Sequence, residues 1–168
     1  MIAGVCMAMK IVILEDNRDR QAVMRACLAD RFYTFEAHFF DEAGEAIRFL
    51  DDNLADTLVI SLDHDLELKP GPDGRLLDPG TGREVADFLA ARTPACPVIL
   101  ATTNSSAAVA MEKVLRGAGW KTRRVVPFDD MRWIETDWFF AIRRALVGPV
   151  GGRPCPETRP SPLEGKGS

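Results

Sequence analysis

The sequence predicts a single α/β domain built on a doubly wound, five-stranded parallel sheet. Three observations favour this fold: apolar runs alternate with helical patterns five times, several of the runs are apolar throughout, and the helical patterns are apolar on one side. Strands that are buried on both faces of a parallel sheet read as continuous apolar runs, and right-handed crossovers place helices on both sides of such a sheet. For five such units we predict the strand order 2-1-3-4-5.

The five strand–helix units are expected within residues 10–147. The expected strands are short runs of mainly apolar residues: KIVIL from residue 10, FYTFEAHFF from 32, TLVISL from 57, PVILA from 97 and TRRVVPF from 122. The expected helices follow these runs in turn: Arg18–Ala29, Glu42–Leu50, Arg83–Ala91, Ala107–Ala118 and Thr136–Leu146. In the fourth helix, apolar residues recur at the spacing i, i+3, i+4, i+7 that is typical of one buried face.

Three stretches lie outside this alternation. Residues 1–9 form a short apolar extension without the basic leading region of a signal peptide. Residues 67–81 form a polar loop rich in Gly and Pro, and loops of this length are typical of functional lids or flexible segments. Residues 148–168 have little apolar content and the Pro/Gly-rich composition of a disordered tail. The folded domain is therefore expected over residues 10–147.

Composition narrows the class of protein. The chain has 168 residues, of which 46% are hydrophobic and 27% charged, and this balance suits one globular domain. Its net charge of -4 disfavours nucleic-acid binding through bulk electrostatics. The four cysteines are widely spaced without a CxxC pair, which disfavours zinc sites and disulfide frameworks. No apolar run approaches the ~20 residues that cross a bilayer, so we predict a cytoplasmic protein with no membrane partner.

Acidic side chains follow the first and third expected strands. Glu15 and Asp16 come after the first strand. Asp63, His64 and Asp65 come after the third. In the predicted strand order these two strands are neighbours, and ligands of such sheets bind beyond their carboxyl ends. Two carboxylates ~4 Å apart repel by about 4 kcal/mol at an effective dielectric constant of 20, so a cation or a shared proton has to offset their charge.

Oxygen ligands favour Mg²⁺ or Mn²⁺ over zinc. The sequence therefore predicts a metal site whose ligands are carboxylates, namely Glu15, Asp16, Asp63 and Asp65. An alternative is that Asp16 or Asn17 caps the helix that follows and that Asp65 only solvates a loop. Capping accounts for Asp16 alone, but not for four acids after two neighbouring strands.

Other polar residues near the expected crevice suit catalysis or phosphate binding. His64 is a candidate general acid or base, because histidine exchanges protons near neutral pH. Thr102, Thr103 and Asn104 follow the fourth strand and offer groups that can hold a phosphoryl oxygen, although capping of the next helix is an equally open role. Arg83 lies at a helix start after Gly80-Thr81-Gly82, where backbone amides and a guanidinium favour an anion.

The order of these residues resembles that of response-regulator receiver domains over residues 10–146. Glu15 and Asp16 match the receiver acids after the first strand, Asp63 matches the acid after the third, and Thr102 matches the hydroxyl residue after the fourth. The resemblance implies a receiver, or flavodoxin-like, fold that binds Mg²⁺. It also implies that Asp63 accepts a phosphoryl group that Thr102 contacts. Val126 stands where receivers have a lysine.

A closer resemblance is to the receiver-like family proposed to process cyclic phosphates. That family carries Asp-His-Asp after the third strand and His-Ser-x-Asn after the fourth. The first motif is present as Asp63-His64-Asp65, whereas the second is present only as Asn104 because Thr102-Thr103 replaces His-Ser. The resemblance implies catalytic roles for Asp63, His64, Thr102 and Asn104. The phosphate-binding roles predicted for Thr103 and Arg83 rest on their hydroxyl and guanidinium groups.

Two classes of function follow from these residues. The leading hypothesis is metal-assisted hydrolysis of a phosphoester such as a cyclic phosphate, with Mg²⁺ or Mn²⁺ as cofactor. Its substrate would be a small phosphorylated molecule or an RNA end. The alternative is an atypical receiver, or a pseudo-receiver, that acts in signalling by contact with a protein partner.

Overall fold

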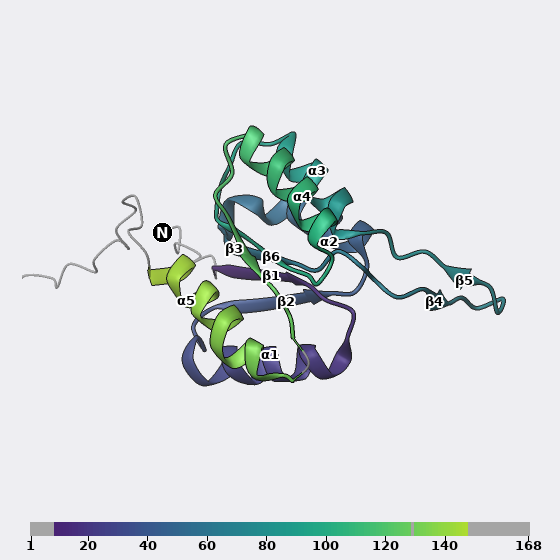
Figure 1. Cartoon of the computed structure of the whole chain (residues 1–168), viewed down its shortest axis with the longest axis horizontal. Coiled ribbons are helices and arrows are strands. Elements are labelled where there is room, and N and C mark those ends of the chain that lie inside the picture. The colour runs from purple at the N-terminus through teal and green to yellow at the C-terminus, as the bar shows by residue number, and fades with distance from the viewer. Residues whose placement is uncertain (1–8, 129, 148–168) are drawn as a thin grey trace, which may run out of the picture.

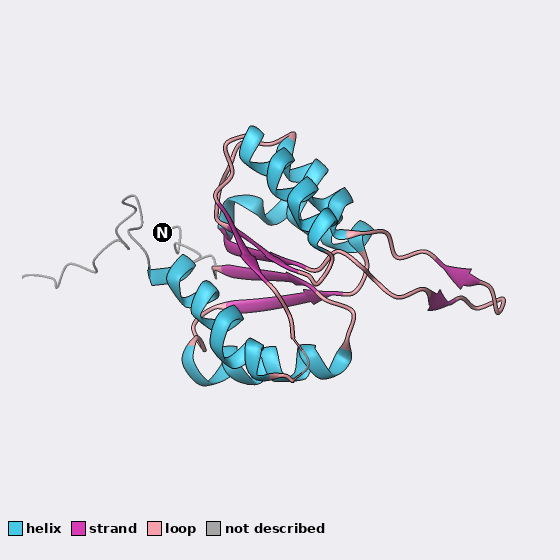
Figure 2. Ribbon diagram, viewed as in Figure 1, coloured by secondary structure: helices cyan, strands magenta, loops and turns pink. Residues whose placement is uncertain are grey.

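The structure is a computed structural model that describes residues 9–128 and 130–147. The predictions for residues 1–8 and for the tail 148–168 fall outside the described residues. Figures 1 and 2 show one central sheet with helices on both faces and a narrow arm that projects from one end of the domain. In the part of the chain that the structure describes, no helix combines the length and apolar character needed to cross a membrane.

The sheet has five parallel strands in the order β2-β1-β3-β6-β7. Its strands are β1 (Lys10–Leu14), β2 (Glu36–Phe40), β3 (Thr57–Leu62), β6 (Val98–Ala101) and β7 (Thr122–Val125). Since β6 and β7 are the fourth and fifth strands of this sheet along the chain, the predicted order 2-1-3-4-5 is confirmed. The doubly wound receiver, or flavodoxin-like, fold is confirmed with it.

Helices cover both faces of the sheet. They are α1 (Arg18–Arg31), α2 (Ala43–Asn53), α3 (Gly82–Ala90), α4 (Ser105–Gly117) and α5 (Phe139–Val147), with a short 3-10 helix at Leu54–Asp56 and a π-helical segment at Ile134–Trp138. Figure 1 shows α1 and α5 on one face and α2, α3 and α4 on the other. The five predicted helices are all present, although the last is preceded by a π-helical segment.

Both faces of the central strands are buried, which explains their continuous apolar sequences. Along β1, Ile11 and Ile13 pack into the core shared with α1 and α5. Val12 and Leu14 point the other way, into the core shared with α2, α3 and α4. A buried hydrogen bond ties the π-helical segment before α5 to the sheet, because the indole nitrogen of Trp138 donates to the hydroxyl of Ser61 over 2.9 Å.

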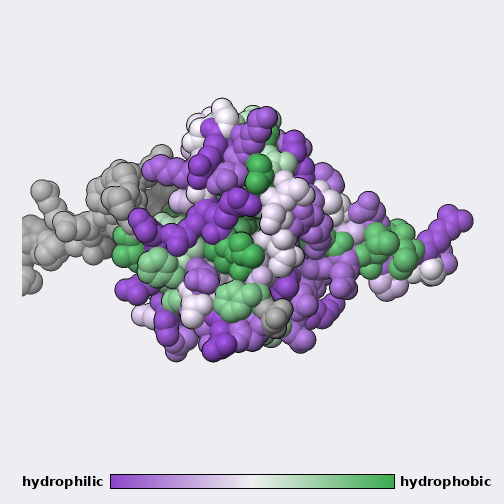
Figure 3. Space-filling model, viewed as in Figure 1, coloured by the Kyte–Doolittle hydropathy of each residue, from purple (hydrophilic) through white to green (hydrophobic). Residues whose placement is uncertain are grey.

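The polar segment at residues 67–81, called the arm below, contains a small hairpin that the sequence analysis missed. Strand β4 (Lys69–Pro70) pairs antiparallel with β5 (Leu76–Leu77). Two-residue strands are too short to show a sequence period. Figure 3 shows a hydrophobic patch on this arm, formed by exposed leucines that include Leu76 and Leu77.

The base of the arm is fastened to the domain by polar contacts. The ammonium group of Lys69 lies 2.7 Å from a carboxylate oxygen of Asp41 and 2.9 Å from one of Glu42. The amide of Ala43 donates to the carbonyl of Pro79 over 2.8 Å. Both ends of the arm are therefore held against the turn between β2 and α2.

The arm returns the chain to the carboxyl end of β3. Asp65 and Thr81 form an isolated antiparallel bridge, and the amide of Gly82 donates to the carbonyl of His64 over 3.1 Å. A Cβ atom on Gly82 would lie 2.0 Å from the carbonyl oxygen of Asp63. Glycine therefore allows the start of α3 to pack directly on the segment that carries the predicted site.

Substitution of Gly82 tests this close approach. We expect Gly82→Ala to lower the free energy of unfolding by roughly 1–3 kcal/mol, because an added methyl group meets backbone that cannot rotate away. Gly117→Ala is the matched control, since nothing lies within 4 Å of its added Cβ and alanine favours a helix. Urea unfolding monitored by circular dichroism measures both. A Gly82→Ala protein as stable as wild type would contradict the packing argument.

Candidate active site

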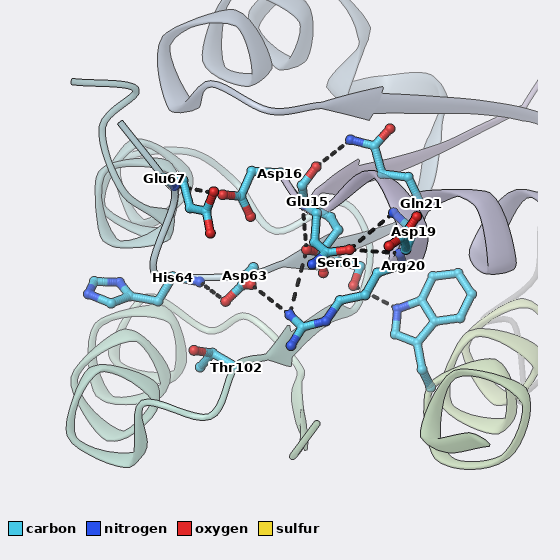
Figure 4. A network of polar contacts seen from close by, with 12 residues as sticks. Glu15, Asp16, Asp19, Arg20, Gln21, Ser61, Asp63, His64, Glu67 and Thr102 are labelled. Atoms are coloured by element: carbon cyan, nitrogen blue, oxygen red, sulfur yellow. Dashed lines mark hydrogen bonds and ion pairs between the residues drawn. The ribbon is translucent and has the colours of Figure 1, made fainter. Parts of the chain in front are cut away.

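Three carboxylates converge where β1 and β3 end. Glu15 and Asp16 follow β1, and Asp63 follows β3. The amide of Asp63 donates to the carbonyl of Leu14 over 2.9 Å. Each of the three acids offers a carboxylate oxygen within 4.8 Å of the other two. Figure 4 shows the three side chains at this edge of the sheet. Glu15, Asp16 and Asp63 are called the acidic cluster below. Parallel pairing of neighbouring strands therefore produces the cluster that the sequence predicted, without Asp65.

Burial makes the charge of this cluster costly. Glu15 is 1% exposed and Asp63 is 6% exposed. Burial raises the pKa of Glu15 to about 7, with a further contribution from the charge of Asp63, while Arg20 opposes the shift. Burial also raises the pKa of Asp63, against the opposing effects of the His64 amide, the Thr102 hydroxyl and Arg20. Ionisation of Glu15 and Asp63 therefore has a free-energy cost that Arg20 and the local hydrogen bonds offset only in part.

The donor atoms of the acidic cluster fit a divalent cation. One carboxylate oxygen of Glu15, Oε1, accepts from the amide of Asn17 over 3.1 Å. The other, Oε2, is buried and has no hydrogen-bond partner among the described residues. A buried acceptor without a partner costs about 1–3 kcal/mol and more when it is charged, and three oxygen donors suit Mg²⁺ or Mn²⁺.

The helix cap is Asn17 rather than Asp16. The side-chain oxygen of Asn17 accepts from the amides of Asp19 and Arg20 over 3.1 and 3.0 Å. Asp16 instead accepts from the amide of Glu67, at the start of the arm, over 2.6 Å. Capping therefore does not account for Asp16, whose carboxylate connects the acidic cluster to the arm.

A second polar group lies beside the acidic cluster. His64, Asp65 and Asn104 are called the His64 group below. The Nε2 atom of His64 is 3.8 Å from Oδ1 of Asp65, and the side-chain amide of Asn104 donates to Oδ2 of Asp65 over 3.2 Å. The Nδ1 atom of His64 is buried and has no hydrogen-bond partner among the described residues. In Figure 4 the imidazole points away from Asp63 and Arg20.

The remaining predicted residues divide between the site and the surface. Thr102 is 3% exposed and its hydroxyl accepts from the amide of Asn104, whose side-chain oxygen also accepts from the amide of Ala107 to cap α4. Thr103 is exposed. The guanidinium of Arg83 pairs with both carboxylate oxygens of Asp87 over 2.8 and 2.9 Å. In the described structure, no hydrogen bond or ion pair joins Thr103 or Arg83 to the acidic cluster or the His64 group.

Sequence reasoning missed Arg20. Its Nη1 atom lies 3.5 Å from Oδ2 of Asp63 and 3.6 Å from Oε1 of Glu15. Its guanidinium also lies over the ring of Trp133, 5.6 Å from the ring centre. The only sequence signal is that Arg20 belongs to the first turn of a helix that starts directly after the acids. Arg18 shares that signal, so the pattern alone could not select between them.

The comparison with known families agrees with this geometry. A family model described as the cyclic-phosphate processing receiver domain matches residues 10–117. The chain belongs to this family. The match to the cyclic-phosphate processing receiver domain spans the acidic cluster, the His64 group and Thr102, together with the arm. No curated protein matches the chain in sequence.

Comparison with solved structures shows that this chain has the receiver fold. A phosphorylated cyanobacterial phytochrome response regulator, RcpA, superposes with a TM-score of 0.63 at 16% identity, over 84% of this chain and 95% of that one. The Mn²⁺-bound form of the response regulator Rcp1 gives 0.61 at 16% identity, over 84% and 96%. A signal receiver domain from Vibrio parahaemolyticus gives 0.56 at 17% identity, over 83% and 93%. At these identities the similarity establishes the fold.

The raised pKa of Glu15 predicts how stability depends on pH in metal-free protein. Between the ordinary value of 4.5 and about 7, the folded state keeps a proton that the unfolded state has lost. Raising the pH through this window should therefore lower the free energy of unfolding, by roughly 3 kcal/mol in total because one pKa unit is ~1.4 kcal/mol. Urea unfolding with a chelator present measures the slope.

Two variants separate this effect from ordinary acid titration. Glu15→Gln should remove most of the slope, because the buried group no longer ionises. Glu45→Gln removes an exposed acid on α2 and should leave the slope unchanged. A wild-type protein whose stability does not fall between pH 4.5 and 7 would show that burial does not raise the pKa of Glu15.

Proposed function

We propose that this domain hydrolyses phosphoesters, with cyclic phosphates as the substrate class. The observation that carries the proposal is the adjacency of three carboxylates to an imidazole at the ends of β1 and β3; one ring nitrogen of this imidazole has no partner among the described residues. The family to which the chain belongs is described as processing cyclic phosphates, which supports the same class of substrate. A small cyclic nucleotide or an RNA end with a cyclic phosphate has the required group.

The acidic cluster would hold the cofactor. Glu15, Asp16 and Asp63 supply three oxygens of the kind that Mg²⁺ and Mn²⁺ prefer, and one oxygen of Glu15 has no hydrogen-bond partner among the residues that the structure describes. A bound Mg²⁺ would supply positive charge against the negative charge that develops on the phosphoryl oxygens. The carboxylates of Glu15 and Asp63 would in turn lose the electrostatic penalty of their burial.

The His64 group would move the proton. The oxygen of a water molecule forms a bond to phosphorus while one of the two ester P–O bonds of the ring breaks. His64 accepts the proton that the water loses and returns a proton to the leaving oxygen, so the product is a phosphomonoester. Asp65 lies 3.8 Å from the Nε2 atom of His64.

One imidazole has to serve both proton transfers. The chain has two histidines, and the other, His38, lies in β2 with its ring 4.4 Å from that of Phe49. No second histidine follows β6, where the family motif His-Ser-x-Asn has one. Thr102 and Asn104 would instead orient the phosphate through their hydroxyl and amide groups.

Hydrolysis of 2′,3′-cyclic nucleotides tests the proposal. In a ³¹P NMR time course with Mg²⁺ or Mn²⁺, we expect conversion of the cyclic phosphate to a monoester by wild type, and none with a chelator. His64→Ala should reduce turnover by about 10²–10⁴-fold, the range for loss of a general acid or base. Asp63→Asn should abolish turnover.

His38→Ala is the matched control, because it removes the other imidazole and leaves the site intact. Turnover by His38→Ala should equal that of wild type. Equal turnover by His64→Ala and wild type would refute the assigned role of His64. Equal turnover by Asp63→Asn would refute the role of the acidic cluster.

A second candidate is an atypical receiver that is phosphorylated on Asp63 and acts by contact with a protein partner. It is favoured by the burial of Asp63 at the end of β3, beside Thr102. Against it, Val126 is 60% exposed at the position of the receiver lysine. Intact-mass analysis after incubation with acetyl phosphate and Mg²⁺ separates the two, and we expect no added phosphoryl group. A stable adduct that Asp63→Asn abolishes would favour the receiver.

A further inference from the structure

Arg20 is the one cationic side chain, among the described residues, that forms ion pairs with the acidic cluster. A single atom, Nη1, makes both contacts, at 3.5 Å to Asp63 and 3.6 Å to Glu15. Charge-assisted hydrogen bonds normally close to about 2.7–2.9 Å. Arg20 is therefore held between the two carboxylates loosely, and another cation can displace it.

Contacts outside the acidic cluster fix the position of Arg20. Its amide is bonded to the Asn17 cap, which sets the first turn of α1 directly after the acids. Its guanidinium lies over Trp133, which is 1% exposed. The side chain of Arg20 is nevertheless 27% exposed, so a solute can reach it. Figure 4 shows the guanidinium of Arg20 beside Asp63.

A divalent cation and Arg20 would use the same carboxylates. Glu15 and Asp63 belong to the group of three that could hold a metal ion, and they are also the two partners of Arg20. The guanidinium has five N–H donors in a planar fork that matches phosphate, and its ion pairs to the cluster use Nη1 alone. Loss of those contacts would make all five N–H donors of Arg20 available to an anion next to the cluster.

We infer that Arg20 is a phosphate-binding residue of this site: it neutralises Glu15 and Asp63 in the metal-free protein and turns to the substrate phosphate when a divalent cation occupies the acidic cluster. The inference rests on the proposed function for its choice of ligand. It gives Arg20 the role that the sequence assigned to Arg83, whose guanidinium is paired with Asp87. It predicts opposite effects of Arg20 on the two ligands.

Two binding measurements test this inference without turnover. Mn²⁺ binding is followed by the electron paramagnetic resonance signal of the free ion, in the absence of phosphate. Arg20→Gln should bind Mn²⁺ about three- to tenfold more tightly than wild type, because the competing cation is gone. Inorganic phosphate binding is followed by calorimetry at saturating Mg²⁺, where Arg20→Gln should lose about 10- to 100-fold in affinity.

Two further variants control for net charge and for side-chain shape. Arg25→Gln removes the same charge from the same helix, at a residue that lies over Phe39 instead of the cluster, and should change neither affinity. Arg20→Lys keeps the charge without the fork, so its phosphate affinity should fall between those of wild type and Arg20→Gln. Circular dichroism verifies that each variant is folded.

Arg20→Gln with unchanged phosphate affinity would overturn the inference. Weaker Mn²⁺ binding by Arg20→Gln would also overturn it, since that result makes Arg20 a structural support of the cluster. The outcome is independent of catalysis: wild type that binds phosphate through Arg20 but hydrolyses no cyclic phosphate would retain this inference and refute the proposed function. Equal hydrolysis by wild type and Arg20→Gln would retain the proposed function and refute this inference.

Discussion

The burial of like charges at the ends of β1 and β3 is the constraint on which the rest of the site depends. Pairing of two parallel strands places Glu15 beside Asp63 whatever their mutual repulsion, because the hydrophobic burial of each strand fixes its register. Glu15 and Asp63 cannot move out to solvent without breaking the core on both sides of the sheet. The charge has to be met by groups brought to it, and Arg20 is the group that α1 brings.

The same constraint explains why the arm starts where it does. Asp16, the least buried acid of the cluster, accepts from the amide of Glu67 and so fixes the first residue of the arm. Gly82 closes the other end by packing on the carbonyl of Asp63. The arm is thus attached at both ends to the residues that would hold a metal ion. A change in the contacts of the Asp16 carboxylate would therefore alter the base of the arm first.

The sequence predicted features that depend on local pattern and strand order. Continuous apolar runs indicated the sheet, and the acids after the first and third runs indicated the cluster, because neighbouring parallel strands end at one edge. It could not predict that Asp65 turns to Asn104 instead of the cluster, since that depends on side-chain geometry. Arg20 and Arg83 show the same limit: both lie at helix starts, and only the packing determines which one meets the acids and which pairs with Asp87.

The position of Arg20 determines which elements of the domain are connected to Asp63. A lysine after β7 would link Asp63 to the edge of the sheet, but Val126 is apolar and exposed there. Arg20 links Asp63 instead to α1 and, through Trp133, to the segment that leads into α5. Because α1 and α5 share one core on the same face of the sheet, displacement of Arg20 by a metal ion would act on that face. The other face meets the site through the arm and α3, so each layer of the fold has its own contact with the acidic cluster.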